Sequence, residues 1–201
     1  MPLCAGADNI SLIADVDGDG QRDEVRDPRR NGTITVAFRD GDERSEVGLG
    51  KARGFWEKLR DAVREDMATR GTVGDFDGDG YVDLALFHSR RDTGDNHSDK
   101  MPLHEMRYGP LARDLTGSRT GTIRIARKSV VEQARATDTD RDGRAELQVS
   151  QSDGDGVLLG LTGRQAKGGV TMGEGRLHED AEEEWRQGEP ALWQDFAPCD
   201  A

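Results

Sequence analysis

Aromatic residues and long apolar stretches are scarce in this chain. Of its 201 residues, 5% are aromatic and 33% are hydrophobic. A chain of this length can form one domain with a core, but the composition predicts a thin core that needs further support. No apolar run is long enough to cross a membrane, so we expect no membrane insertion.

Familiar catalytic motifs are missing as well. The sequence contains no Gly-x-Ser-x-Gly, no His-Glu-x-x-His and no Walker-type phosphate loop. We therefore expect that the protein is not an enzyme. A glycosidase-like pair drawn from its 40 acidic residues stays open as an alternative.

Basic residues are outnumbered. There are 28 Lys and Arg residues against 40 Asp and Glu residues, and the net charge is −12. Phosphate binding requires clustered Lys and Arg, so this balance argues against a nucleic-acid partner and against anionic membranes.

Many of the carboxylates occur in three similar loops. The clearest lies within residues 74 to 87, where acidic residues alternate and an apolar strand-like run follows. The oxygen ligands expected from it are the side chains of Asp75, Asp77, Asp79 and Asp83 and the carbonyl of Tyr81. Hard oxygen ligands at this spacing favour Ca²⁺, and Gly80 permits the sharp turn.

Two further copies repeat the pattern at intervals of about 60 residues. The first offers Asp15, Asp17, Asp19, Gln21 and Asp23, and the third offers Asp138, Asp140, Asp142, Arg144 and Glu146, where Gln21 and Arg144 contribute carbonyls. We therefore predict about three calcium ions per chain. The cluster at 153 to 156 lacks the full ligand set, so we interpret it as a turn.

These loops differ from the helical EF-hand, which needs a Glu at the twelfth loop position. Here the twelfth positions hold Arg26, Leu86 and Val149. Short runs of strand composition follow the loops at 83 to 87 and 146 to 150, so each closing acid is expected at the start of a strand. The sequence predicts an all-β fold.

The loops resemble those of the FG-GAP or VCBS repeat family. Residues 74 to 87 match best, and 14 to 25 and 137 to 149 are clear relatives. The resemblance implies β-propeller-like blades with calcium in hairpin loops on one side: three blades, with a degenerate fourth as one option. An incomplete propeller, a small ring and a fragment completed by oligomerisation all stay open.

We expect a single domain over 1–201. Its repeats span about 10–50, 71–128 and 129–165, with a helical insertion at about 51–70 and a docked tail at 166–201. The insertion carries an apolar helical stripe over 55 to 68.

Other segments give smaller predictions. Asn31-Gly32 indicates a hairpin turn before a strand at 33 to 38, and another strand is expected at 121 to 128. Residues 89 to 102 are expected to form an exposed loop, with solvated histidines in and around it. These histidines are His88, His97 and His104. The tail is expected to include a short helix at 178 to 187 and to dock through its aromatic residues.

Cys4 and Cys199 lie near opposite ends of the chain. A disulfide would join the termini of a closed fold, and two free thiols are the alternative. Calcium loops of this kind usually face extracellular calcium in an oxidising setting. No export signal is visible, so we expect a mature or truncated secreted or cell-surface protein, or else a cytosolic one.

Three classes of function follow. The first is a secreted or cell-surface calcium-binding module that binds an extracellular protein or glycan, with calcium as a structural ion. The second is a hydrolase or lyase on the same scaffold, and the third is a structural part of a larger assembly. Activity screening with and without a chelator separates the second class from the first.

Overall fold

The computed structural model describes residues 3–8, 10–51, 67–90, 103–125, 129–152, 158–166, 168–173, 176–177, 193 and 196–199. Within these ranges the regular structure is β-strand, apart from one 3₁₀ turn, η1 (Leu49–Lys51). The all-β prediction is confirmed. No helix among the described residues has the length and apolar character needed to span a membrane.

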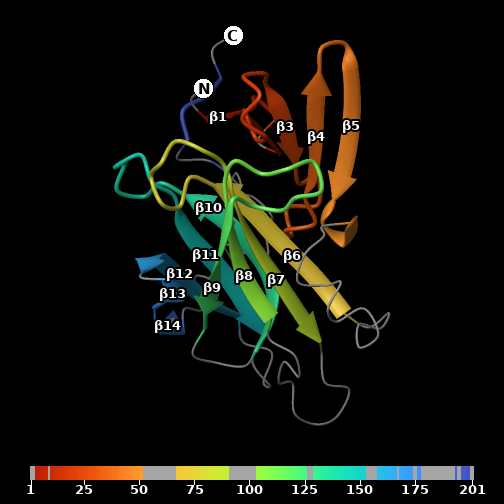
Figure 1. Cartoon of the computed structure of the whole chain (residues 1–201). Coiled ribbons are helices and arrows are strands. Elements are labelled where there is room, and N and C mark those ends of the chain that lie inside the picture. Colours follow the sequence, from red (N-terminus) through yellow and green to blue (C-terminus); the bar gives the residue numbers. More distant parts are fainter. Residues whose placement is uncertain are drawn as a thin grey trace.

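The first sheet has five antiparallel strands in chain order, at one end of the molecule (Figure 1). Its strands are β1 (Cys4–Ala5), β2 (Ser11–Ala14), β3 (Asp23–Arg26), β4 (Thr35–Asp40) and β5 (Glu43–Gly48). The predicted turn at Asn31-Gly32 lies in the β3–β4 connection, where Gly32 has a φ of 80°.

The second sheet has nine strands. They are β6 (Met67–Gly74), β7 (Asp83–Arg90), β8 (Leu103–Tyr108), β9 (Arg119–Arg124), β10 (Val130–Thr137), β11 (Glu146–Ser152), β12 (Leu158–Ala166), β13 (Gly169–Met172) and β14 (Arg176–Leu177). The order is β10-β11-β12-β13-β9-β8-β7-β6, and β14 pairs with β12. The strands β13 and β14 lie within the predicted tail.

Three units of four consecutive antiparallel strands make up most of both sheets. They are β2–β5, β6–β9 and β10–β13, and in each the first connection is an acidic loop. We call these loops loop 1 (15–23), loop 2 (75–83) and loop 3 (138–146). The sequence repeat thus corresponds to a repeated four-stranded unit.

The second and third units share one sheet because β9 and β13 pair in parallel. Glycines permit this close approach: a Cβ on Gly121 would lie 2.9 Å from the Cα of Gly169. On the other side of these units, β6 lies beside β10. The described strands therefore form no ring of separate blades.

The core runs through all three units. Its largest fully buried apolar side chains are Phe38, Leu12, Leu84, Leu86, Phe87, Met106, Tyr108, Leu111, Leu115, Leu147 and Trp193. Inward and outward residues alternate on β3, as expected for a strand with one buried face.

The two termini are fastened together beside β1. Cys4 and Cys199 form a disulfide with their Cα atoms 4.8 Å apart, so the predicted pairing is confirmed. The amide of Ala5 donates to the carbonyl of Ala197 at 2.8 Å, and the amide of Cys199 donates to the carbonyl of Ala5 at 2.9 Å. In the loop-entropy model, closing so long a loop stabilises the fold by about 5 kcal/mol.

Trp193 anchors the end of the chain to the second sheet. Its side chain is buried, and its indole Nε1 donates to the carbonyl of Val73 in β6 at 3.1 Å. Trp193 belongs to the segment that was predicted to dock, and it is the residue between 178 and 195 that the structure describes. The predicted helix at 178–187 lies outside the described residues.

Three local predictions need correction. The helix predicted to end at residue 68 overlaps β6, which begins at Met67, because the β6–β7 ladder extends to the pair Met67 and Arg90. For the same reason Ser89 lies buried in β7, not in a loop. His88 is also buried in β7, so the solvated-loop interpretation is wrong for it.

The other residues covered by these predictions are His104 and several segments that the structure does not describe. His104 lies half-buried in β8, so the solvated-loop interpretation is wrong for it as well. The insertion at 52–66, the loop at 91–102 with His97, the end of the predicted strand at 126–128 and the turn at 153–156 lie outside the described residues.

Candidate metal centres

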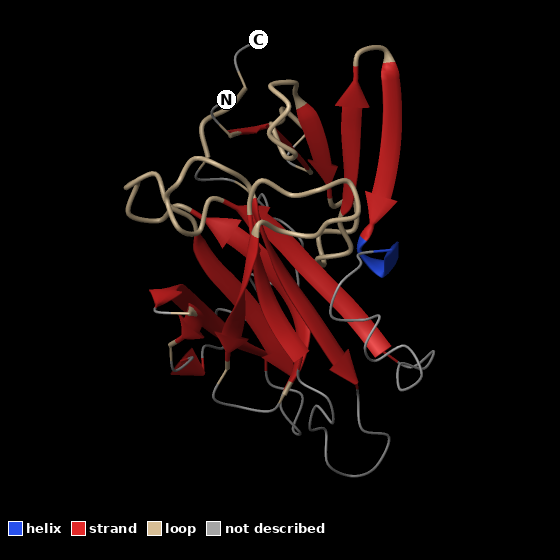
Figure 2. Ribbon diagram, in the orientation of Figure 1, coloured by secondary structure: helices blue, strands red, loops and turns tan. Residues whose placement is uncertain are grey.

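Each acidic loop is the turn of the first hairpin of its unit. The last cross-strand pairs before the loops are Ala14 with Asp23, Gly74 with Asp83, and Thr137 with Glu146. The closing acid is therefore the first residue of β3, β7 or β11, as predicted. Figure 2 shows the connecting loops gathered where the two sheets approach each other.

The first acid of each loop accepts a hydrogen bond from the amide of the sixth loop residue, a glycine. The pairs are Gly20 to Asp15 at 3.0 Å, Gly80 to Asp75 at 2.9 Å and Gly143 to Asp138 at 3.2 Å. These glycines have φ values of 86°, 88° and 86°, in the left-handed region that glycine adopts readily. The sharp turn is thus built in the same way three times.

The closing acid and the third acid repeat their contacts too. The closing acid accepts from the second loop residue: Val16 to Asp23 at 2.9 Å, Phe76 to Asp83 at 2.9 Å and Thr139 to Glu146 at 3.0 Å. The third acid accepts from the seventh: Gln21 to Asp19 at 2.7 Å, Tyr81 to Asp79 at 2.9 Å and Arg144 to Asp142 at 2.9 Å. These bonds fix the orientation of the closing acid and of the third acid in each loop.

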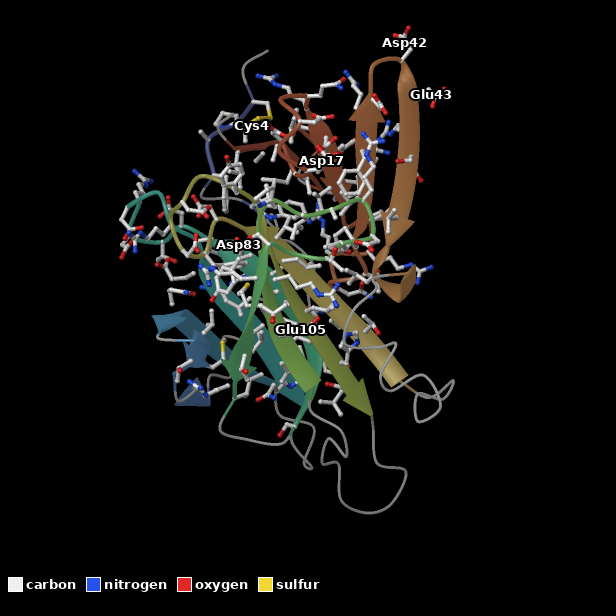
Figure 3. All side chains as sticks on the ribbon, in the orientation of Figure 1. Cys4, Asp17, Asp42, Glu43, Asp83 and Glu105 are labelled. Carbon is white, nitrogen blue, oxygen red and sulfur yellow. A yellow bond between two sulfur atoms is a disulfide. The ribbon has the colours of Figure 1, made fainter. Side chains whose placement is uncertain are left out.

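In each loop, three carboxylates have oxygen atoms within 4.8 Å of one another. The groups are Asp15, Asp17 and Asp19; Asp75, Asp77 and Asp83; and Asp138, Asp140 and Glu146. Asp23, Asp79 and Asp142 are predicted ligands that lie outside these groups of three. Figure 3 shows Asp17 on the side of the five-stranded sheet and Asp83 at the facing end of the nine-stranded sheet.

Burial of negative charge sets the electrostatics of loop 2. Asp83 is fully buried, and this burial raises its pKa to about 7, against the hydrogen bonds from the amides of Gly109 and Phe76. The charges of Asp77 and Asp75 raise it further. Burial also raises the pKa of Asp75. A bound cation would offset the free-energy cost of holding these groups ionised.

Burial raises a carboxylate pKa in loop 1 as well, and one carboxylate oxygen of this loop has no hydrogen-bond donor among the described residues. Burial raises the pKa of Asp23, although the amides of Arg39 and Val16 donate to its carboxylate. Oδ1 of Asp15 is buried, and no described residue donates a hydrogen bond to it. An oxygen in this situation is suited to a cation, because a buried acceptor without a partner is otherwise destabilising.

Two arginines from outside the loops pair with the carboxylates. Arg113, in the β8–β9 connection, lies 3.3 Å from Asp17, 3.3 Å from Asp40 and 3.8 Å from Asp19. Arg119, in β9, pairs with Asp77. Our sequence reasoning missed both, and no local signal marks them, since they lie 96 and 42 residues from the aspartates that they contact.

The donor set fits a hard divalent cation such as Ca²⁺. The residues that would hold it are the acids of each group. When bound, the ion would supply positive charge and link the two strands of the hairpin. Comparison of the chain with family models, curated proteins and solved structures found no match.

Proposed function

We propose that this chain is a calcium-binding repeat module of a secreted or cell-surface protein, with about three structural calcium ions. The observation that carries the proposal is the threefold recurrence of one hydrogen-bond pattern around three carboxylate groups. Surface carboxylates without a common role would not be expected to repeat the same hydrogen bonds in three hairpins.

The disulfide supports the extracellular part of the proposal. Disulfides persist mainly in oxidising compartments, and extracellular calcium is plentiful enough to fill sites of modest affinity. The thin core supports a structural role for the ions, because the loops join strands that carry core residues such as Leu12, Leu84 and Leu147.

The four-stranded units support kinship with FG-GAP or VCBS repeats. Each is an antiparallel meander whose first turn is the acidic loop, as the resemblance implies. In this proposal the units correspond to blades, and the second and third are joined edge to edge through β9 and β13. The module would bind an extracellular protein or glycan.

Thermal unfolding with and without a chelator tests the structural role of calcium. At free calcium a hundredfold above the dissociation constant, each site stabilises the fold by about 2.7 kcal/mol, so chelation should lower the melting temperature by many degrees. Asp77→Ala should lose much of this response. Asp42→Ala is the matched control, because Asp42 lies at the exposed tip of the β4–β5 hairpin (Figure 3).

Equal melting temperatures in calcium and in chelator would contradict the proposal. Its binding part is tested separately with arrays of purified extracellular proteins and glycans. Capture that depends on calcium would support it, and no binding to either array would contradict that part alone.

A further inference from the structure

The three acidic loops are stacked in chain order. A Cβ on Gly78, the fourth residue of loop 2, would lie 2.9 Å from Cγ and 3.0 Å from Cδ of Arg144, the seventh residue of loop 3. A Cβ on Gly18, the fourth residue of loop 1, would lie 3.1 Å from Cβ of Pro110 and 3.8 Å from Cε1 of Tyr81, the seventh residue of loop 2. Each of these glycines therefore lies close to a side chain of the following loop.

Backbone contacts link loop 2 to loop 3. The amide of Ala145 donates to the carbonyl of Asp75 at 2.7 Å. Ala145 immediately precedes Glu146, so the first acid of loop 2 and the closing acid of loop 3 are joined by one hydrogen bond and one peptide link. The Cβ of Ala145 also packs against Gly74, the residue before loop 2.

A second route links loop 2 to loop 1 through residues 109–111. The amide of Gly109 donates to Oδ1 of Asp83 at 2.9 Å, and two residues later the amide of Leu111 donates to the carbonyl of Val16 at 2.9 Å. Val16 in turn donates its own amide to Asp23. The closing acids of the two loops are therefore connected through hydrogen-bonded backbone.

Loop 3, at one end of the stack, differs from loops 1 and 2. The second loop residue is buried in loops 1 and 2, as Val16 and Phe76, but the equivalent Thr139 of loop 3 is exposed. The fourth residue is glycine in loops 1 and 2, but Arg141 in loop 3, with a φ of 57°. Among the described residues, the contacts given above join loop 2 to both of the other loops, and loop 3 exposes its second and fourth residues.

We propose that cation binding is coupled between neighbouring loops, so that an ion in loop 2 raises the calcium affinity of loop 1 and of loop 3. This inference rests on the calcium function proposed above. An ion that orders loop 2 fixes the carbonyl of Asp75 and the carboxylate of Asp83, which position Ala145 and Gly109. Loops 1 and 3 then lose less conformational entropy when they bind their own ions, so their calcium affinity rises.

Coupling should fall off along the stack. The contacts described run from loop 1 to loop 2 and from loop 2 to loop 3, as in repeat proteins whose units interact with their nearest neighbours. Losing the ion of loop 2 should weaken loop 3 strongly, whereas losing the ion of loop 1 should affect loop 3 only through loop 2.

Calcium titration followed by nuclear magnetic resonance tests this directly. The amides of Gly20, Gly80 and Gly143 are matched reporters, since each donates to the first acid of its own loop. Asp77→Asn and Asp17→Asn are matched variants, because they make the same change at the same loop position. We expect the calcium affinity of loop 3 to fall about fivefold or more in Asp77→Asn and less than about twofold in Asp17→Asn.

Equal affinities of loop 3 in the wild type and in Asp77→Asn would overturn the coupling and leave the calcium function intact. Absence of any calcium-dependent shift at the three glycines would overturn both. If Asp77→Asn does not fold, the wild-type titration decides. Loops 2 and 3 filling together, more steeply than a single site, supports the coupling, and separate single-site curves overturn it.

Discussion

Loops 2 and 3 share most of their internal hydrogen bonds, but their first acids differ in burial and in the number of amides that donate to them. Asp75 is buried and accepts from the amides of Gly78, Asp79 and Gly80. Its counterpart Asp138 is half-buried and accepts from two amides. Loop 3 covers loop 2 at Gly78 and at the carbonyl of Asp75. We therefore expect more of the fold's stability to depend on loop 2 than on loop 3.

The largest expected difference is between Asp75→Ala and Asp138→Ala. In calcium-free buffer, Asp75→Ala should lower the free energy of unfolding by about 2 kcal/mol, because it removes the acceptor of three part-buried hydrogen bonds, while Asp138→Ala removes two exposed ones and should cost about 1 kcal/mol or less. Urea denaturation monitored by circular dichroism measures both. Equal losses would mean that the two loops have equivalent surroundings.

The far end of β7 should respond to acid independently of the loops. His88 is buried, and this burial lowers its pKa to about 2, with the charge of Arg107 contributing. The unfolded chain takes up a proton near pH 6.5 that the folded chain does not, so stability is lost as the pH falls below 6.5. The loss should be about 2 kcal/mol between pH 6.5 and 5.

His88→Asn should flatten this pH dependence, because its amide oxygen can take the place of Nδ1 beside Oγ1 of Thr69, now at 3.2 Å. Urea denaturation across this pH range, with and without calcium, gives the slopes. An unchanged slope in His88→Asn would assign the acid sensitivity to other groups, and a slope abolished by calcium would locate it in the loops.

Comparing two glycine variants of loop 2 distinguishes the cost of a clash with loop 3 from the cost of backbone strain, and the expected difference is smaller. Gly78→Ala and Gly80→Ala both place a side chain at a left-handed φ, +77° and +88°, but only the former meets Arg144. We expect Gly78→Ala to be less stable than Gly80→Ala by about 1 kcal/mol. Thermal unfolding of the two variants measures this, and adding Arg144→Ala should remove the difference. If the two variants still differ in stability when Arg144 is alanine, the cause lies within loop 2 and not in its contact with loop 3.

The smallest effect concerns the uncovered end of the stack. Arg141 has a φ of 57°, so Arg141→Gly should relieve strain and raise the free energy of unfolding by less than about 1 kcal/mol. Differential scanning calorimetry is sensitive enough to detect it. Destabilisation would show that the Arg141 side chain makes a contact worth more than the strain.

Local patterns in the sequence were sufficient to predict the hairpins and the positions of the closing acids. Asp83 could be placed at the start of a strand because alternating acids and the apolar run that follows are both short-range signals. The disulfide was predictable only as one of two options, since thiol proximity depends on where distant segments meet.

Long-range contacts could not be predicted from the sequence. Arg113 meets Asp17 across 96 residues, and nothing beside either residue indicates it. The same holds for the parallel pairing of β9 with β13, which depends on two glycines approaching each other. His88 was misplaced because it adjoins the polar stretch at 89 to 102, which indicates a loop, while the β6–β7 ladder extends past it and places it in the interior.

Calcium content is the most direct measurement of the role assigned to the loops. The protein is dialysed against calcium, freed of excess ion and analysed for metals, with Asp77→Ala and Asp42→Ala in parallel. We predict about three calcium ions per chain in the wild type and in Asp42→Ala, and fewer in Asp77→Ala. A wild-type chain that retains no calcium, or retains zinc instead, would contradict the assignment.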